Sequence, residues 1–181
     1  SNGDSVSPGT PRFREPVGLA IDGMDYLWVA DTQNDKVKVV DLLSADPYPL
    51  ETREAAPTGF TQGFTTAPRA VGFSADFSRY YHVVEGQHYV LACGTAPAAL
   101  TAAPAAPTAL PALTWTAGQA AAGIKDGTRA VAQLNNPSSL ALVPGVVLYI
   151  CDSGTHSIRA IVDGSTVMST VFGDGACGTH G

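Results

Sequence analysis

The sequence is short of charged residues and of long apolar runs. Charged side chains make up 14% of the 181 residues, and 10 Lys and Arg face 16 acidic residues, so the formal net charge is −6. Phosphate binding relies on clustered positive charge, but Arg12, Arg14, Lys36 and Lys38 form only a modest basic group. No apolar stretch approaches the roughly 18 residues of a membrane-spanning helix. We therefore expect no nucleic-acid partner and no membrane insertion.

The sequence also lacks the motifs of common catalytic sites. It contains no G-x-S-x-G, no H-E-x-x-H and no phosphate-binding glycine loop that leads into a helix. The four histidines, His82, His88, His156 and His180, occupy unlike positions in the pattern described below. A zinc site needs about three convergent protein ligands. We therefore expect these histidines to make turn hydrogen bonds or to lie on the surface, and we expect no catalytic, cofactor or metal site.

What the sequence does contain is an internal repeat. Residues 16–21 and 27–32 recur as residues 137–142 and 148–153, and the spacing from the first proline to the aspartate, Pro16 to Asp31 or Pro137 to Asp152, is 15 residues in both copies. A weaker copy lies between them, where Glu85 follows Pro68 by 17 residues. A repeat of this kind determines the architecture before any single residue does.

Each copy is typical of a small antiparallel sheet. A short apolar strand follows the proline, and after a Gly/Asp turn a second strand ends in the acidic residue. The third strand, at 36–39 and 157–161, alternates between apolar and polar residues, and a fourth is visible at 113–116 and 167–172. Four antiparallel strands in each repeat predict an all-β protein built from propeller blades.

These residues resemble the NHL repeat. The first copy carries P-x-G-L-A-I-D from Pro16, then L-x-V-A-D-T, then N-x-x-V from Asn34. Residues 152–159 are similar to the D-x-G-N-H-x-I-R run of the family, with Thr155 in place of the usual asparagine. The resemblance implies a β-propeller, most often one of six blades.

The repeat predicts three four-stranded blades. Blade one covers about residues 11–58, blade two about 64–118 with an Ala/Pro/Thr-rich insertion at 94–111, and blade three about 128–173. Residues 174–181 repeat the linker that precedes blade three, so we expect them to lead to a further blade. We expect residues 44–66 to form an outer loop and the insertion to be a rim loop or an O-glycosylated stalk. Three blades do not close a ring, so we expect a piece of a longer protein or a half-propeller completed by another chain.

The matched polar residues are assigned to the blade itself. An acid that recurs at the end of the second strand is better explained by the turn that follows, where its carboxylate accepts backbone N–H groups, than by one catalytic or calcium site. We therefore interpret Asp31, Asn34, Asp152 and His156 as structural turn residues.

The three cysteines allow one pair. Cys151 takes the place of Ala30 in the repeat, so we expect it to pack inside its blade. Cys93 and Cys177 are a candidate disulfide, which would indicate an oxidising compartment, and Cys177 could equally pair with a cysteine outside this sequence.

These observations predict a non-catalytic interaction or scaffold module of a larger, extracellular or surface-exposed assembly. Its partners would be a protein, a glycan or further blades of the same protein, bound through the propeller faces and loops. The alternative is a fragment of a lyase-like or lactonase-like propeller enzyme whose active residues lie in blades outside this sequence. RNA binding, known in some NHL proteins, is disfavoured by the acidic charge.

Overall fold

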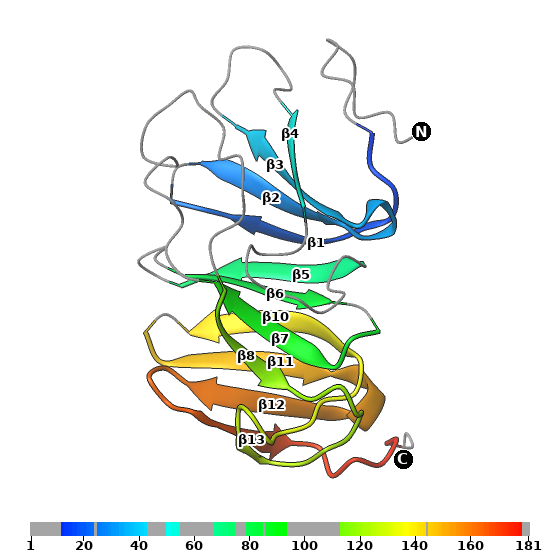
Figure 1. Ribbon diagram of the computed structural model, residues 1–181, viewed down its shortest axis with the longest axis vertical. Coiled ribbons are helices and arrows are strands. Elements are labelled where there is room, and N and C mark those ends of the chain that lie inside the picture. Colours follow the sequence, from blue (N-terminus) through cyan, green and yellow to red (C-terminus); the bar gives the residue numbers. More distant parts are fainter. Residues whose placement is uncertain are drawn as a thin grey trace.

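The structure consists of three antiparallel β-sheets arranged as neighbouring blades (Figure 1). It is a computed structural model that describes residues 12–23, 25–42, 50–54, 67–74, 79–84, 86–93, 113–143 and 145–178. No helix in these ranges is long and apolar enough to cross a membrane. The all-β fold and the division into three blade-like sheets agree with the prediction from the repeat.

Blade one contains four strands that pair in chain order: β1 (Pro16–Ile21), β2 (Tyr26–Asp31), β3 (Lys36–Asp41) and β4 (Leu50–Glu54). The prediction of a loop throughout 44–66 was therefore wrong for β4. This strand pairs with β3 alone at the outer edge of the sheet. Because an edge strand is held by the backbone ladder of one neighbour, its sequence needs no strong apolar alternation.

Blade two repeats this order with β5 (Pro68–Phe73), β6 (Tyr80–Val84), β7 (Tyr89–Cys93) and β8 (Leu113–Gly118). The predicted insertion falls between β7 and β8, outside the described residues.

Blade three contains β10 (Pro137–Val143), β11 (Val147–Asp152), β12 (Ser157–Val162) and β13 (Val167–Phe172). The short strand β9 (Gly127–Thr128) pairs with the outer edge of β13, so this sheet has five strands. We call the residues that precede the first strand of a blade its lead-in segment: 12–15 for blade one and 119–136 for blade three. Since β9 lies in the second of these, the lead-in segment holds blade three at both its inner and its outer side.

The first strands of the blades, β1, β5 and β10, lie together at the centre of the molecule, and all three begin on the right in Figure 1. The residue before each initial proline, Glu15, Ala67 or Asn136, has a left-handed backbone with φ of 52°, 54° and 53°. Such a conformation is uncommon for residues other than glycine. Its recurrence shows that each chain enters its blade through the same bend.

Gly18 sets how closely the first two blades approach. A Cβ at this position would lie 2.5 Å from the carbonyl oxygen of Arg69, a distance that the backbone of β5 could not relieve without shifting. The absence of a side chain therefore allows β1 and β5 to pack backbone against backbone.

Apolar side chains fill the two spaces between the blades. Aromatic residues dominate the space between blades one and two, where Trp28 lies 5.2 Å, centroid to centroid, from both Phe73 and Tyr80. Aliphatic residues dominate the space between blades two and three, which also receives Ala132 and Leu134 from the lead-in segment. The core of this protein therefore lies between its sheets, and each blade depends on its neighbour for stability.

We predict that Leu134→Ala destabilises the chain by about 2–5 kcal/mol, because Leu134 is fully buried and its truncation leaves a cavity between two blades. Urea unfolding followed by tryptophan fluorescence would measure the change. Val131→Ala is the matched control in the same segment, since Val131 is 46% exposed and should cost less than about 0.5 kcal/mol. Equal losses for the two variants would contradict the role of the lead-in segment.

Candidate functional site

Two buried carboxylates occupy equivalent places in blades one and three. Asp31 ends β2 and Asp152 ends β11, and neither has measurable exposure. Oδ1 of Asp31 accepts the backbone N–H of Arg14 at 2.6 Å, and Oδ1 of Asp152 accepts that of Asn135 at 2.7 Å. Both donors belong to lead-in segments. Each carboxylate therefore ties the lead-in segment to the end of the second strand.

The second oxygen of each carboxylate binds the turn that follows. Asn34 Nδ2 donates to Oδ2 of Asp31 at 2.7 Å, and Thr155 Oγ1 donates to Oδ2 of Asp152 at 2.6 Å. Thr155, which departs from the repeat pattern, thus makes the same hydrogen bond as the asparagine that it replaces. The structure places Asp31, Asn34 and Asp152 within the turn network to which the sequence analysis assigned them.

A buried cation completes each site. Lys38 Nζ lies 2.7 Å from Oδ2 of Asp31, and Lys38 is 1% exposed. Arg159 Nη1 lies 3.4 Å from Oδ2 of Asp152, and its side chain has no exposure. Lys38, which the sequence analysis counted in a modest basic group, is therefore buried and paired with Asp31. A signal for both pairs was present in the sequence, because each cation follows its aspartate by seven residues.

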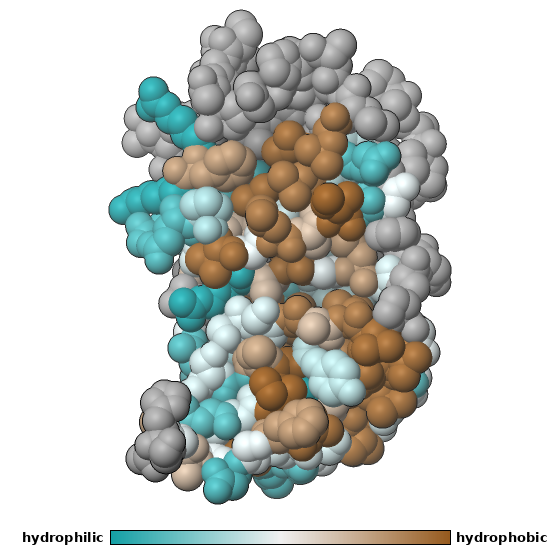
Figure 2. All heavy atoms as spheres, turned by 180° about the vertical axis from the view of Figure 1, so that it is seen from behind, coloured by the Kyte–Doolittle hydropathy of each residue, from teal (hydrophilic) through white to brown (hydrophobic). Residues whose placement is uncertain are grey.

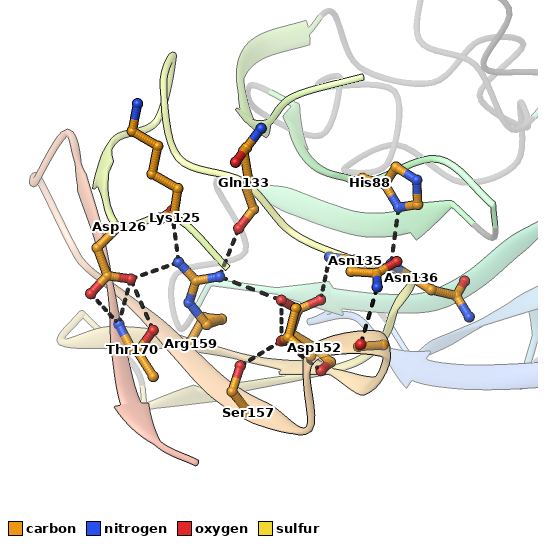
Figure 3. Close-up of polar contacts among 12 residues, drawn as sticks. His88, Lys125, Asp126, Gln133, Asn135, Asn136, Asp152, Ser157, Arg159 and Thr170 are labelled. Atoms are coloured by element: carbon orange, nitrogen blue, oxygen red, sulfur yellow. Dashed lines mark hydrogen bonds and ion pairs between the residues drawn. The ribbon is translucent and has the colours of Figure 1, made fainter. Parts of the chain in front are cut away.

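Arg159 also holds the lead-in segment of blade three (Figure 3). Its guanidinium donates to the carbonyls of Gln133 at 2.7 Å and Lys125 at 3.0 Å, and it pairs with Oδ1 of Asp126 at 2.7 Å. Thr170 of β13 donates to the same Asp126 carboxylate. One buried side chain thus links the third strand, the fourth strand and the lead-in segment.

The two acids beside Arg159 have opposite pKa shifts. Burial raises the pKa of Asp152, and the hydrogen bonds from Thr155 and Asn135 and the charge of Arg159 oppose this only in part. For Asp126, burial also acts to raise the pKa, but hydrogen bonds from Thr170 and Arg159 outweigh it and the pKa is lowered. The difference fits their surroundings, because Asp126 is 49% exposed while Asp152 is fully buried.

The turn after the second strand of each blade carries a further matched position. Asp35 in blade one and His156 in blade three both end a 3₁₀ turn in the left-handed conformation, with φ of 56° and 51°. Asp35 Oδ1 accepts the N–H of Ala67 at 2.8 Å, and at the same position in blade two His88 Nδ1 accepts the N–H of Asn136 at 3.0 Å. These acceptors bind the residue that precedes the initial proline of the next blade. His156 stands at the same position in blade three and is exposed.

Blade two lacks the buried acid. Pro68 pairs with Val84 in the same way as Pro16 pairs with Asp31 and Pro137 with Asp152. The acid position is therefore occupied by Val84, which is fully buried, and the expected match of Glu85 to this position was wrong. A one-residue shift in the degenerate copy explains the error.

The structure also corrects the expectations for two cysteines. Cys151 is exposed, although Ala30 at the same repeat position is fully buried. Ala30 faces blade two, and the corresponding face of blade three has no neighbouring blade among the residues that the structure describes. Cys177 carries a free thiol, so the candidate Cys93–Cys177 disulfide is absent. Cys93 pairs with Tyr80 at the end of blade two remote from the lead-in segments, whereas Cys177 follows β13 at the opposite end.

His82 lies in the core, contrary to the expectation of a surface or turn residue. It is fully buried in β6, its ring centroid lies 5.4 Å from that of Tyr80, and neither ring nitrogen has a hydrogen-bond partner in the part of the chain that the structure describes. Burial lowers its pKa from 6.5 to about 4. The imidazole is therefore neutral near pH 7 and packs as an aromatic side chain.

Exposed polar groups surround the buried carboxylates at the starts of the inner strands. Gln33 donates to the carboxylate of Glu15, and the hydroxyls of Ser138 and Ser153 lie 2.5 Å apart. We call these residues, together with Arg14, the polar rim. No group of three or more His, Cys, Asp or Glu residues that could hold a metal ion occurs within the described ranges. The rim therefore offers hydrogen-bonding groups, and the buried acids are occupied in holding the blades.

Comparison with solved structures identifies the architecture. The chain superposes on an auxiliary nutrient binding protein from Bacteroides ovatus with a TM-score of 0.63 at 14% identity, covering 88% of this chain and 36% of that one. A second auxiliary nutrient binding protein, from Bacteroides thetaiotaomicron, gives 0.58 at 20% identity over 84% and 35%. The periplasmic gluconolactonase of Pseudomonas aeruginosa gives 0.57 at 15% identity over 90% and 40%.

These neighbours are β-propeller proteins, and the chain has the fold of a β-propeller fragment. It spans well under half of the length of each neighbour. No family model matches the chain, and no curated protein is similar to it. At these levels of identity the likeness establishes the fold alone.

We predict strong coupling between Asp152 and Arg159. Asp152→Val should cost about 3–5 kcal/mol because it removes the buried acceptor of the Asn135 N–H and leaves the buried Arg159 with the half-exposed Asp126 in place of a buried anion. Arg159→Leu should cost a similar amount. The loss of unfolding free energy in the double variant should be at least about 1 kcal/mol smaller than the sum of the two single losses. The reason is that blade two has the apolar residues Val84 and Leu91 at these two register positions, so the fold accepts an apolar pair there. Urea unfolding of the four proteins would measure the coupling.

The ion pair Arg79–Asp163 is the control for this cycle. Both of its side chains are 42% exposed, so its coupling free energy should lie below about 1 kcal/mol. Additive losses at Asp152 and Arg159 would contradict a shared buried site.

We predict that His82 makes the fold acid-sensitive. Its folded pKa of about 4 lies below its ordinary value of 6.5, so the unfolded chain binds more protons between these values and stability falls as the pH falls through this window. His82→Leu should remove about 2 kcal/mol from the difference in unfolding free energy between roughly pH 7.5 and pH 4.5. If the His82 variant kept the full pH dependence, this account of the buried imidazole would be wrong.

Proposed function

We propose that this chain is a non-catalytic interaction module of the NHL type, which binds a protein or a glycan through the strand-end surface of its blades. The observation that supports this most is that the repeated acids form hydrogen bonds inside their own blades. Asp31 and Asp152 are the residues that the repeat places at matched strand ends, where a carboxylate could be catalytic or bind calcium, and both are fully buried and bonded within their blades.

The polar rim supports binding at the same end of the molecule. Gln33 and Ser153 are exposed there, and their amide and hydroxyl groups are suited to hydrogen bonds with a glycan or a peptide backbone. The lead-in segment that carries Arg14 and Glu15 is fixed by a buried carboxylate, since Asp31 accepts the N–H of Arg14. Rigid support of this kind reduces the entropy lost on binding.

A propeller enzyme of the lactonase kind is the alternative, because the structural neighbours include a gluconolactonase as well as nutrient binding proteins. In that case the reacting groups would lie in blades outside this sequence.

The lactonase alternative places its reacting groups outside this sequence, so binding through the polar rim, and not turnover, separates the two functions for this chain. We predict that the purified chain shows no hydrolysis of gluconolactone above the uncatalysed rate, with or without added Ca²⁺ or Zn²⁺, and no stoichiometric metal by elemental analysis. On a glycan array or with a peptide library, binding should depend on the rim. The double variant Arg14→Ala and Gln33→Ala should weaken any such binding at least about tenfold, while Ser165→Ala on a remote turn should not. Metal-dependent turnover of the lactone would overturn the proposal.

A further inference from the structure

Blade three has one covered face and one open face. Alternate residues of its strands point to opposite sides, and Leu148, Ile150, Ile161 and Met168 belong to the core shared with blade two. The intervening residues form the opposite face, which we call the free face, and no described segment packs on it as a further blade. Several of its apolar members are exposed, with Val143 at 45%, Val162 at 58% and Phe172 at 69%.

The free face contains a hollow of about 360 Å³ lined by Cys151, Ile158, Phe172 and His156, among others. In blade two the corresponding register positions are Val83, Val90 and Ala117, which pair across the sheet as Cys151, Ile158 and Phe172 do. Those three residues are fully buried in one cluster with Leu134 and Ala132 of the lead-in segment of blade three. The open hollow is thus equivalent to a space that a lead-in segment fills between blades two and three.

The polar contact beside this space also has an open counterpart. In blade two, His88 Nδ1 accepts the N–H of Asn136, the left-handed residue that precedes the first proline of blade three. Asp35 makes the same contact with the N–H of Ala67. His156 stands at this position in blade three and is exposed. The free face therefore offers both an apolar hollow and a hydrogen-bond acceptor for a residue with left-handed backbone.

The chain itself carries a segment with the required features. Counting back from the initial proline, Phe13 corresponds to Leu134 and Glu15 to Asn136, and Glu15 has φ of 52°. Phe13 is 38% exposed and lies over the ammonium group of Lys38, 5.1 Å from ring centroid to Nζ. One side of this ring is thus supported by blade one, and the other side is open to a neighbour.

The first strand of blade one is complementary to the free face as well. Leu19 and Ile21 occupy the positions of Leu140 and Leu142, which pack into the core between blades two and three. In blade one they are 64% and 55% exposed. Apolar side chains of this size at an open sheet face favour a protein partner.

Both open faces lie on one side of the molecule. Seen from behind, apolar residues extend over blade one in the upper half and over blade three in the lower half (Figure 2). A single partner with the same two faces could therefore cover both at once through a two-fold rotation. Such a rotation closes the assembly and leaves no apolar face for further growth.

We propose that two copies of this chain pair head to tail. The lead-in segment and blade one of each copy cover the free face of blade three of the other, with Phe13 in the hollow and the N–H of Glu15 bonded to His156. The pair brings together six blades. This inference concerns self-association and does not depend on the proposed binding function of the polar rim.

The mass in solution tests the proposal. Light scattering on a size-exclusion column and sedimentation at micromolar concentrations should give twice the chain mass of 18.6 kDa. Cys151→Arg should weaken association at least about tenfold, because it would bury an unpaired charge in the hollow. Leu19→Arg should do the same from the other side. Ala121→Arg, at an exposed position of the lead-in segment of blade three, is the control that should remain paired.

Mixing the variants tests the head-to-tail geometry. Cys151→Arg and Leu19→Arg should each be monomeric when alone. A mixture of the two should associate again, because the unaltered blade three of Leu19→Arg can bind the unaltered blade one of Cys151→Arg. Pairing of blade three with blade three would leave Leu19→Arg dimeric and would overturn the proposal, as would a monomeric wild-type chain. Circular dichroism would verify that both variants fold, as expected for substitutions at exposed positions.

Thiol reactivity gives a second readout that does not depend on mass. In the paired form Cys151 should react with iodoacetamide at least about tenfold more slowly than Cys177, which lies outside the hollow. In Leu19→Arg the two rates should converge, with peptide mass spectrometry resolving the sites. Equal rates in the wild-type chain at concentrations where it is dimeric would place the contact elsewhere.

Discussion

A carboxylate without access to water constrains the rest of the blade. Burial of an ionised Asp152 is tolerated only if donors surround it, and the donors come from three separate parts of the chain. Asn135 supplies the lead-in segment, Thr155 the turn, and Arg159 the third strand. Asp31 accepts from the equivalent groups in blade one, namely the lead-in segment, the turn and the third strand. In both blades the need to satisfy a buried carboxylate therefore positions the lead-in segment against the end of the second strand.

Blade two shows that the geometry survives without the charges. Val84 is buried where the other blades have an aspartate, and the adjoining space is filled by aromatic packing around Trp28 and Tyr80. His82 joins this packing as a neutral ring whose nitrogens have no partner among the described residues. Replacing an ion pair with apolar groups in this way is often neutral for stability, but the buried imidazole gives blade two a sensitivity to acid.

The same contacts explain why the two outer faces are sites for association. Between blades, a lead-in segment contributes one apolar residue and one left-handed N–H donor, as in Leu134 and Asn136, and the first strand that follows contributes an apolar face, as in Leu140. Blade one and its lead-in segment carry the apolar residue and the N–H donor of such a contact, Phe13 and Glu15. Blade three carries the hollow and the acceptor, His156. The polar rim adjoins this contact, because Glu15 belongs to the rim and Ser153 also lines the hollow.

The sequence by itself determined the repeat, most of the strands and the turn role of Asp31, Asn34 and Asp152, because strand alternation and turn chemistry are local. The turn or surface position expected for His82 and the burial expected for Cys151 were wrong for a common reason, which also explains why Lys38 is buried. A repeat gives the position of a residue within its blade, but burial is decided by what covers that face. Blade one covers His82, the lead-in segment covers Lys38, and no blade in the described part of the chain covers Cys151. Only the tertiary structure contains that information, since the covering segments come from elsewhere in the chain.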